Sequence, residues 1–251
     1  MLIINADDWG RSLAETDAAL ACAQVGRVTS VSAMVFMADS ERAAKLAHEH
    51  HVDVGLHLNL TEQFTGGSVP RAVTEDHTRV IRYLKGSKRA QLIYHPLLRK
   101  QFTAAFTAQL IEFQRLYGQP PSHVDGHHHM HLCSNLLLSG VVPAGMRMRR
   151  NFSFWPGEKS FLNRSYRALV DRWLARKFRL PDYFFCVLQS SRAGRMDRIK
   201  TLARSANVEL MTHPAVAEES RYLMSHEFAS LLQGLQLGSF AQLGDIQQRR
   251  P

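Results

Sequence analysis

The sequence contains little cysteine and no long uninterrupted apolar segment. Its three cysteines, Cys22, Cys133 and Cys186, lie far apart, and no C-x-x-C pair occurs. We therefore expect free thiols in a reducing compartment rather than a disulfide framework. No run of about 18 apolar residues is present, which argues against a membrane-spanning helix. The opening MLIINADDWG has neither the basic segment nor the cleavage site of a signal peptide, so we expect a cytoplasmic protein.

The charge balance is strongly basic, with a formal net charge of +9 over 251 residues. A hydrophobic share of 45% and a charged share of 21% are ordinary for a globular protein with a sizeable core. The positive charge favours nucleic acid, an anionic membrane surface or an acidic substrate as partner. Because the basic residues are spread out and no RNA-binding signature or Cys-His finger spacing occurs, we expect no nucleic-acid partner.

Short apolar segments alternate with segments of helical spacing. Helices are expected over residues 12–24, 40–50, 99–117 and 160–179, and strands within 1–5, 27–36, 52–60, 122–129, 146–157, 182–188, 208–214 and 238–243. This alternation predicts an α/β fold with a parallel sheet and crossover helices. Seven to eight mostly parallel strands favour an imperfectly closed barrel, and an open doubly wound sheet is the alternative. No repeat or linker divides the chain, so we expect a single domain over 1–251.

Four polar clusters lie where predicted strands end. In chain order they are Asp7 with Asp8, His57, Asp125 with His127, and His213. Because the carboxyl ends of parallel strands share one face of an α/β fold, residues about 200 positions apart can converge there. Alone, each cluster has an ordinary explanation as a turn, a core histidine or a solvated loop. Their joint occurrence at strand ends favours a functional site.

Aspartate and neutral imidazole together suit a divalent ion such as zinc, with three protein ligands and an open position for water. A second carboxylate can then act as general base. Adjacent aspartates point in different directions in an extended chain, so one of Asp7 and Asp8 would bind the ion and the other would face the water or a neighbouring group.

Five of the thirteen histidines lie within HVDGHHHMHL, residues 123–132. If the strand continues here, alternation puts Asp125, His127, His129 and His131 on one face. If a helix begins at His127, then His127 and His131 are neighbours. Both alternatives place His127 inward, so we expect it to bind the ion while its neighbours orient ligand rings.

These segments resemble the YdjC-like carbohydrate deacetylases, which include chitooligosaccharide deacetylase. The resemblance rests on IINADDWG, RVTSVSAMVF, VGLHLNLTE, PPSHVDGHHHMHL and ELMTHP, in that order and with similar spacing. It covers most of residues 1–135 and resumes near 208. The chain departs from the family in having DDW for the commoner DDF and MTHP for the commoner MCHP, and residues 140–195 match weakly.

The resemblance implies a deformed (β/α) barrel that removes an acetyl group from an N-acetylated sugar or oligosaccharide with one divalent ion, magnesium or zinc. It implies that Asp8, His57 and His127 bind the ion and that Asp7 is the base. Asp125 and His213 complete the candidate catalytic residues. We expect His213, or a histidine of 127–131, to protonate the departing amine.

The weakly matching segment 140–195 is expected to shape substrate choice. Its stretch RMRRNFSFWPGEKS joins three arginines to two phenylalanines and a tryptophan. Aromatic rings stack on apolar sugar faces, and arginine binds phosphate or carboxylate. A charged or lipid-linked N-acetyl sugar is therefore one candidate substrate. The alternative is that the aromatics belong to the core and the arginines to a solvated face. If the substrate is charged or lipid-linked, we expect the basic helix over 160–179 to contact an anionic membrane peripherally. A homodimer is an option.

Two other functions compete with deacetylation. A metal-dependent hydrolase of another bond, such as a phosphoester, would usually need more carboxylates for a two-metal site. A non-catalytic protein that binds nucleic acid or membrane through its basic face would leave the strand-end acids unexplained.

Overall fold

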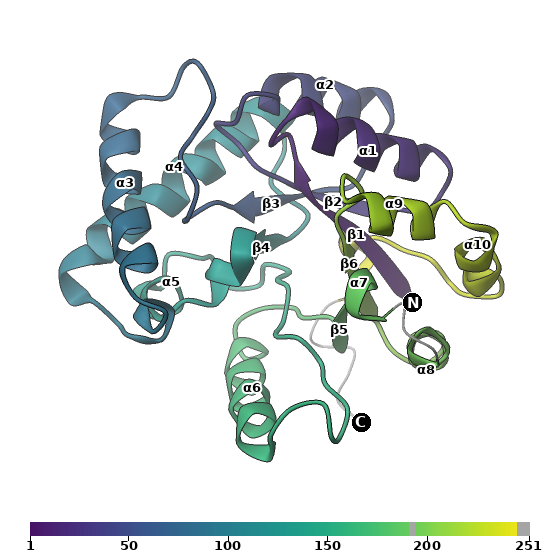
Figure 1. Cartoon of the computed structure of the whole chain (residues 1–251). Helices are drawn as coiled ribbons and strands as arrows, with labels where there is room; N and C mark the ends of the chain where they lie inside the picture. Colours follow the sequence, from purple (N-terminus) through teal and green to yellow (C-terminus); the bar gives the residue numbers. More distant parts are fainter. Residues whose placement is uncertain (191–193, 245–251) are drawn as a thin grey trace. The chain divides into compact units, whose positions relative to one another are not determined.

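The computed structural model describes residues 1–190 and 194–244 of the chain. Six strands form one sheet in the order β4-β3-β2-β1-β6-β5 (Figure 1). They are β1 (Leu2–Trp9), β2 (Ser30–Ala33), β3 (Val54–Leu58), β4 (Val124–Gly126), β5 (Tyr183–Cys186) and β6 (Val208–Thr212). The pairs β1–β6, β2–β3, β3–β4 and β5–β6 are all parallel. The prediction of an α/β fold with a parallel sheet is thus confirmed.

The predicted number of strands, seven to eight, was wrong, because two expected strands do not form. Within 146–157 only isolated bridges occur, and Pro156 and Gly157 (φ +91°) end any extended run there. Within 238–243 the side chain of Ser239 instead caps a 3₁₀ helix, η4 (Phe240–Gln242), and Gln242 completes the capping box. In the segment 238–243, the capping interactions therefore favour a 3₁₀ helix over the strand that the apolar pattern predicts.

Three of the four predicted helices are present close to their expected bounds. The α-helices are α1 (Leu13–Gln24), α2 (Ser40–Glu49), α3 (Arg71–Gly86), α4 (Arg99–Tyr117), α5 (Ser134–Ser139), α6 (Phe161–Leu174), α7 (Val187–Ser190), α8 (Arg195–Ala203), α9 (Ala217–Leu223) and α10 (His226–Leu232). The expected helix over 160–179 is shorter, since α6 ends at Leu174. The segment 61–98, where no helix or strand was predicted, contains α3 and two 3₁₀ turns, η1 (Ala90–Leu92) and η2 (Pro96–Leu98). None of the helices in the described residues is long and apolar enough to cross a membrane.

The chain forms two compact units, each with its own contacts. One comprises residues 7–17 and 31–143, and the other comprises 1–6, 18–30 and 144–251. The prediction of a single domain over 1–251 stays a prediction, and residues 191–193 and 245–251 of that range lie outside the described residues.

In the unit of residues 7–17 and 31–143, α4 is the central packing element. It contacts α2, α3, α5 and β3, and α3 runs beside it (Figure 1). Its buried side chains Phe102, Phe106 and Phe113 supply much of the apolar surface of this unit. Gly118, at φ +66°, ends α4 in the left-handed conformation that glycine adopts without strain. This packing fixes β3 and β4, which carry several of the polar strand-end residues.

In the second unit, a fully buried ion pair joins the segment after residue 144 to the sheet. Nε of Arg149 donates to Oε1 of Glu209, on β6, at 2.6 Å, and neither side chain is exposed to solvent. The guanidinium also lies over the Phe184 ring, 4.9 Å from its centre. Removing a charge from water costs solvation free energy, and the attraction between the two charges offsets this cost. If one partner is removed, the other remains buried without that compensation.

We expect Arg149→Met to lower the free energy of unfolding by about 3–5 kcal/mol, because Glu209 would be left buried without its countercharge. The double variant Arg149→Met/Glu209→Leu should recover most of this loss. Urea unfolding followed by circular dichroism measures both. Arg71→Met, at a highly exposed side chain on α3, is the control and should change stability by less than about 0.5 kcal/mol. An Arg149 variant as stable as this control would contradict a structural role for the pair.

Candidate active site

Three of the four polar clusters meet within the unit of residues 7–17 and 31–143. Asp7 and Asp8 lie near the end of β1, and His57 lies on β3. Asp125 lies on β4 directly beside His57 in the parallel register, and His127 follows β4. All five residues are buried, with at most 7% of their surface exposed. The predicted convergence of Asp7, Asp8, His57, Asp125 and His127 is therefore present in the fold.

The backbone at Asp8 departs from an extended strand. Its φ is +66°, in the left-handed region that aspartate tolerates better than most residues but that still costs energy. This twist lets both adjacent carboxylates approach one imidazole: Asp8 Oδ1 lies 3.4 Å from His57 Nε2, and Asp7 Oδ2 lies 4.0 Å from it. The premise that strand alternation would turn the two aspartates apart does not hold here.

His57 lies between carboxylates on both sides of its ring. Its Nδ1 is 2.8 Å from Asp125 Oδ1, while its Nε2 faces Asp7 and Asp8. Asp125 is held in turn by the hydroxyl of Ser32, which donates to Oδ2 at 2.9 Å. A carboxylate behind one ring nitrogen fixes the orientation of the imidazole and leaves the other nitrogen available to a ligand.

Behind Asp125, close packing keeps this arrangement in place. The Ser32 hydroxyl also lies 2.9 Å from Nε2 of His123, which is fully buried. A Cβ built on Gly55 would fall 2.2 Å from the His123 ring, so only glycine fits at this position of β3. His123, the first histidine of the cluster, thus belongs to the support of the site.

The histidine cluster adopts neither of the two conformations considered for it. The 3₁₀ segment η3 (His127–Leu132) begins at once after β4, with a kink at His128 and His129, whose φ values are +53° and +58°. His127 and His131 are buried, and His128 is exposed. The Cβ of any residue other than glycine at 126 would fall 2.6 Å from the His131 amide nitrogen. The kink turns His127 inward, as predicted, and directs its neighbours differently from one another.

Glu62 and Arg11 also belong to the site, although neither was among the predicted site residues. His127 Nδ1 lies 2.9 Å from Asp8 Oδ1, and its Nε2 lies 3.1 Å from Glu62 Oε1. Arg11 donates to both oxygens of Glu62, each at 3.0 Å. The sequence carried a sign of both residues. Glu62 is the last residue of the motif VGLHLNLTE, and Arg11 follows shortly after the aspartate pair.

Opposite charges at short range shift the ionisation of the buried groups. Burial alone would lower the pKa of His57, but the charges of Asp125 and Asp7 and the hydrogen bonds to Asp125 and Asp8 raise it to about 10. Burial alone would raise the pKa of the Asp8 carboxyl, yet His127 and His57 hold it well below its ordinary value. The site is therefore built around ionised carboxylate at neutral pH.

The donor set can hold a metal ion. One donor atom each of Asp8, His57 and His127 lies within 4.8 Å of the others, and Asp7, His57 and Asp125 form a second such group. Asp8 Oδ1 and His127 Nε2 are buried, but neither makes a well-directed hydrogen bond. Buried polar atoms without such partners are uncommon, and an ion held by Asp8, His57 and His127 would give Asp8 Oδ1 a partner. One carboxylate and two imidazoles are a ligand set typical of zinc and other divalent ions.

His213 lies in the other unit, just after β6. It is about one-third exposed, and its Nδ1 lies 3.5 Å from Oε1 of Glu219. Glu219 is buried on α9 and accepts hydrogen bonds from the Thr212 hydroxyl and from the His213 backbone at 2.7 and 2.8 Å. A buried carboxylate thus holds the His213 ring in place, a role that the sequence pattern did not reveal for Glu219.

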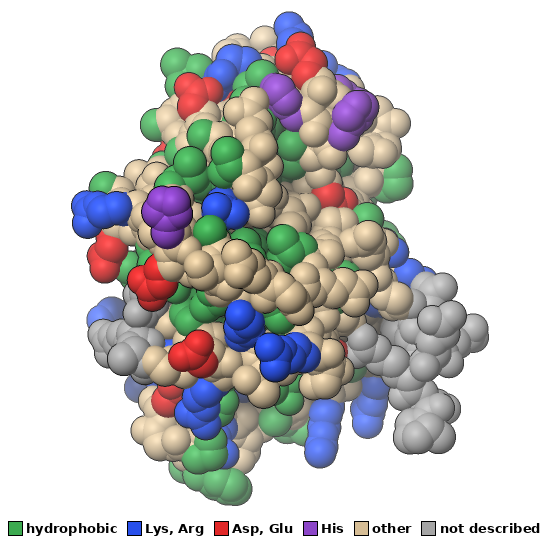
Figure 2. Space-filling model, turned by 90° about the vertical axis from the view of Figure 1, so that its right-hand side faces the viewer, with side chains coloured by type: hydrophobic (Ala, Val, Ile, Leu, Met, Phe, Trp, Pro, Cys, Tyr) green, Lys and Arg blue, Asp and Glu red, His purple; other side chains and the backbone are tan. Residues whose placement is uncertain are grey.

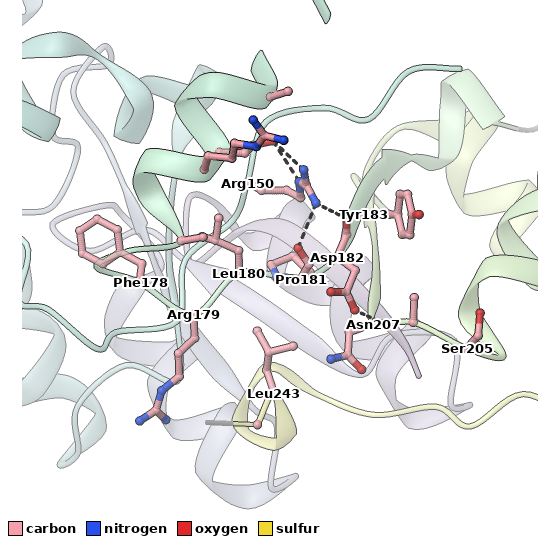
Figure 3. A pocket seen from close by; sticks show the side chains of 16 residues that line it. Arg150, Phe178, Arg179, Leu180, Pro181, Asp182, Tyr183, Ser205, Asn207 and Leu243 are labelled. Carbon is pink, nitrogen blue, oxygen red and sulfur yellow. Dashed lines mark hydrogen bonds and ion pairs between the residues drawn. The ribbon is translucent and has the colours of Figure 1, made fainter. Parts of the chain in front are cut away.

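The arginines of RMRRNFSFWPGEKS have protein partners. Arg149 pairs with Glu209, and Arg147 donates to the Leu243 carbonyl. Arg150 donates to the Asp171 carboxylate and to the carbonyls of Pro181 and Asp182, at the wall of a cavity of about 1020 Å³ (Figure 3). From the sequence, these arginines could bind substrate or lie on a solvated face, and the structure ties all three to the fold.

The aromatic residues of the same segment divide into two groups. Phe152 stacks on the Phe184 ring at 4.4 Å. Trp155 stacks on Phe185, and the guanidinium groups of Arg195 and Arg198 both lie 4.7 Å from its ring centre. Trp155, Arg195 and Arg198 line a cavity of about 840 Å³.

Comparison with known proteins identifies the family. The profile of the YdjC-like protein family matches residues 1–234. The chain belongs to the YdjC-like family. A chitooligosaccharide deacetylase of Proteus mirabilis is 29% identical over 245 residues, which cover 92% of this chain and 87% of that protein.

Two further relatives match a shorter part. A chitooligosaccharide deacetylase of Serratia marcescens is 33% identical over 53% of this chain and 51% of its own length. A mouse carbohydrate deacetylase is 33% identical over 52% of this chain and 43% of its own length. The matched part thus spans about half the length of these two YdjC-like relatives.

The fold is shared with a solved structure. A candidate cellobiose-phosphate cleavage protein of Enterococcus faecalis superimposes with a TM-score of 0.66 and covers 97% of this chain and 98% of its own. At 20% identity, this similarity concerns the fold alone.

The raised pKa of His57 predicts a pH-dependent stability for the metal-free protein. Because this pKa moves from 6.5 to about 10 on folding, the stabilisation is complete below pH 6.5 and is lost as the pH rises through 10. We expect the free energy of unfolding with chelator present to fall by about 1 kcal/mol or more between pH 6.5 and 9. Urea titrations at each pH measure this, with His57→Gln as the variant that should lack the fall. A flat profile for the unsubstituted protein would contradict a protonated His57 in the folded state.

Proposed function

We propose that this protein is a divalent-metal-dependent carbohydrate N-deacetylase, which hydrolyses the acetamide of an N-acetylated sugar or oligosaccharide. The observation that carries the proposal is the buried group of Asp8, His57 and His127, whose donor atoms lie within 4.8 Å of one another beside a second aspartate, Asp7. The deacetylases among the relatives of this YdjC-like chain support the substrate class.

Asp8, His57 and His127 would hold the ion, either magnesium or zinc, and the two imidazoles favour zinc. When bound, a divalent ion supplies a Lewis acid for the acetyl carbonyl and lowers the pKa of a bound water. Asp125 does not face the reacting atoms in this proposal. It holds the His57 ring through Nδ1, so we assign it a positioning role.

Asp7 accepts the proton of the attacking water, since its Oδ2 lies 4.0 Å from His57 Nε2 and its carboxylate is not needed as a ligand. The water oxygen bonds to the acetyl carbon, and the C–N bond then breaks. A proton passes to the departing nitrogen from His213, which Glu219 orients, or from a histidine of the 127–131 group. The products are acetate and a free amino sugar.

Phosphoester hydrolysis is a less suitable reaction for this site. The group of Asp8, His57 and His127 shares His57 with the group that contains Asp7 and Asp125. It shares His127 with a third group, which contains Glu62 and His128. They therefore resemble one centre with overlapping neighbours more than two separate metal positions. A purely structural or binding role would leave the strained Asp8 backbone and the buried carboxylates without a function.

For the substrate, we propose recognition of a charged or lipid-linked N-acetyl sugar. The surface around Trp155 supports it, because Arg195 and Arg198 lie over the Trp155 ring and Lys159 lies over the Phe154 ring, and such rings could stack on a sugar face. Arg147, Arg149 and Arg150 have no part in this version of the proposal.

The two adjacent aspartates should respond differently to substitution. Asp7→Asn should keep the metal but lower turnover by about 10²–10⁴-fold, because only the general base is lost. Asp8→Asn should lose both metal and activity. Metal content by mass spectrometry and acetate release from N-acetyl sugars test this division, with Asp17→Asn, at an exposed acid, as the control. Equal metal loss in both variants would show that the roles are not divided in this way.

The substrate proposal predicts a salt-sensitive preference for charge. An N-acetyl sugar that carries a phosphate should be deacetylated with a lower KM than a neutral chitooligosaccharide at low salt, and the difference should shrink at high salt. Arg198→Gln should raise the KM for the charged substrate alone. Steady-state kinetics with both substrates provide the measurement. A preference for the neutral sugar that salt does not change would exclude a charged substrate.

A further inference from the structure

Helix α6 exposes a row of large apolar side chains, and its buried residues are Asp171 and Leu174. The side chains of Leu162, Tyr166 and Leu169 are 80%, 54% and 67% exposed, and that of the neighbouring Phe161 is 76% exposed. With the half-buried Trp173, these residues recur at i, i+4, i+7 and i+11, which places them along one face of the helix. Large apolar side chains in such a row are normally turned toward a core.

The inward side explains why the helix cannot simply turn over. Asp171 is buried and accepts hydrogen bonds from Arg150 and from the backbone and side chain of Asn151. Arg167 donates to Asn163 at 2.9 Å and lies over the Phe154 ring. These polar contacts hold α6 against the segment 150–154, so the apolar row stays on the outside.

The surroundings of the apolar row are basic. Between residues 159 and 179 the chain has seven lysines and arginines but a single acid, Asp171, which is buried. Lys159, Arg172, Arg176 and Lys177 are exposed. Figure 2 shows hydrophobic and basic side chains next to one another at the lower end of the view, where α6 lies in Figure 1.

We propose that α6 docks this protein onto an anionic lipid surface, with Leu162, Tyr166 and Leu169 inserted among the lipids. An apolar row flanked by lysine and arginine is the pattern of helices that lie in a membrane interface. Tyrosine and tryptophan favour that interface, because each has an apolar ring and a polar edge. The chain needs no spanning helix for such an attachment.

The basic residues around the apolar row favour an anionic lipid surface over a second copy of the chain as the partner of α6. In a symmetric dimer through α6, the same basic residues of both copies would surround one apolar contact, and their repulsion would oppose association. Anionic headgroups neutralise these residues instead, and the attraction extends over about one Debye length, roughly 10 Å at moderate salt.

Sedimentation with vesicles tests the proposal. We expect the protein to bind vesicles of phosphatidylcholine with phosphatidylglycerol, and to bind pure phosphatidylcholine vesicles much more weakly. Leu162→Glu/Leu169→Glu should lower the partition coefficient by about 100-fold, since each inserted leucine contributes at least a factor of about ten. Leu97→Glu/Leu138→Glu is the matched control, because it changes two exposed leucines outside α6 and the net charge equally.

Three results would overturn the proposal. One is the absence of binding to anionic vesicles, and another is an equal loss of binding in the two leucine pairs. The third is a dimer, detected by light scattering, that only Leu162→Glu/Leu169→Glu dissociates. Circular dichroism of each variant shows whether it is folded. Because binding is measured without substrate, its failure would leave the proposed deacetylase activity untouched.

Discussion

The arrangement of the site depends on the contact between His57 and the carboxylates on its two sides. Asp125 holds Nδ1 at 2.8 Å, and Asp7 and Asp8 face Nε2. Burying so many charges is stable only if each has a partner, and this explains the supporting hydroxyl of Ser32 and the clamp of Arg11 on Glu62. In the metal-free protein, the positive charge of protonated His57 compensates the surrounding carboxylates, and a bound cation could do so instead. We infer that the same electrostatic demand shapes the fold and prepares the site for an ion.

Much of the fold could be predicted because its elements carry strong local signals. The strands of the sheet are apolar runs, and α4 combines a regular row of phenylalanines with a glycine stop at Gly118. Helix α3 was missed, although its buried residues His77, Val80, Ile81 and Leu84 have helical spacing. The stretch 238–243 was assigned wrongly because one capping serine outweighed its apolar pattern. For α6, the sequence predicted an amphipathic helix but not which side faces the protein, since that depends on partners from residues 150–154.

The candidate site was predictable where residues lie at strand ends. The topology of a parallel sheet brings such ends together, so Asp7, Asp8, His57, Asp125 and His127 could be grouped without coordinates. Glu62, Glu219 and Arg11 lie in loops or on helices, where no periodicity marks their direction. The left-handed backbone at Asp8 and at His128 was equally hidden, because it results from the surrounding packing. Sequence therefore indicated the candidate ligands of the site better than the groups that hold them.

The central claim is that one buried centre of Asp8, His57 and His127 binds a divalent ion. A crystal of the protein soaked with zinc, with diffraction recorded on both sides of the zinc absorption edge, tests it most directly. The account predicts one strong anomalous peak at about 2.0–2.2 Å from a donor atom of each of these three residues, with Asp7 nearby but not bound. A peak on other residues, or no peak at this centre in a zinc-saturated crystal, would contradict the account.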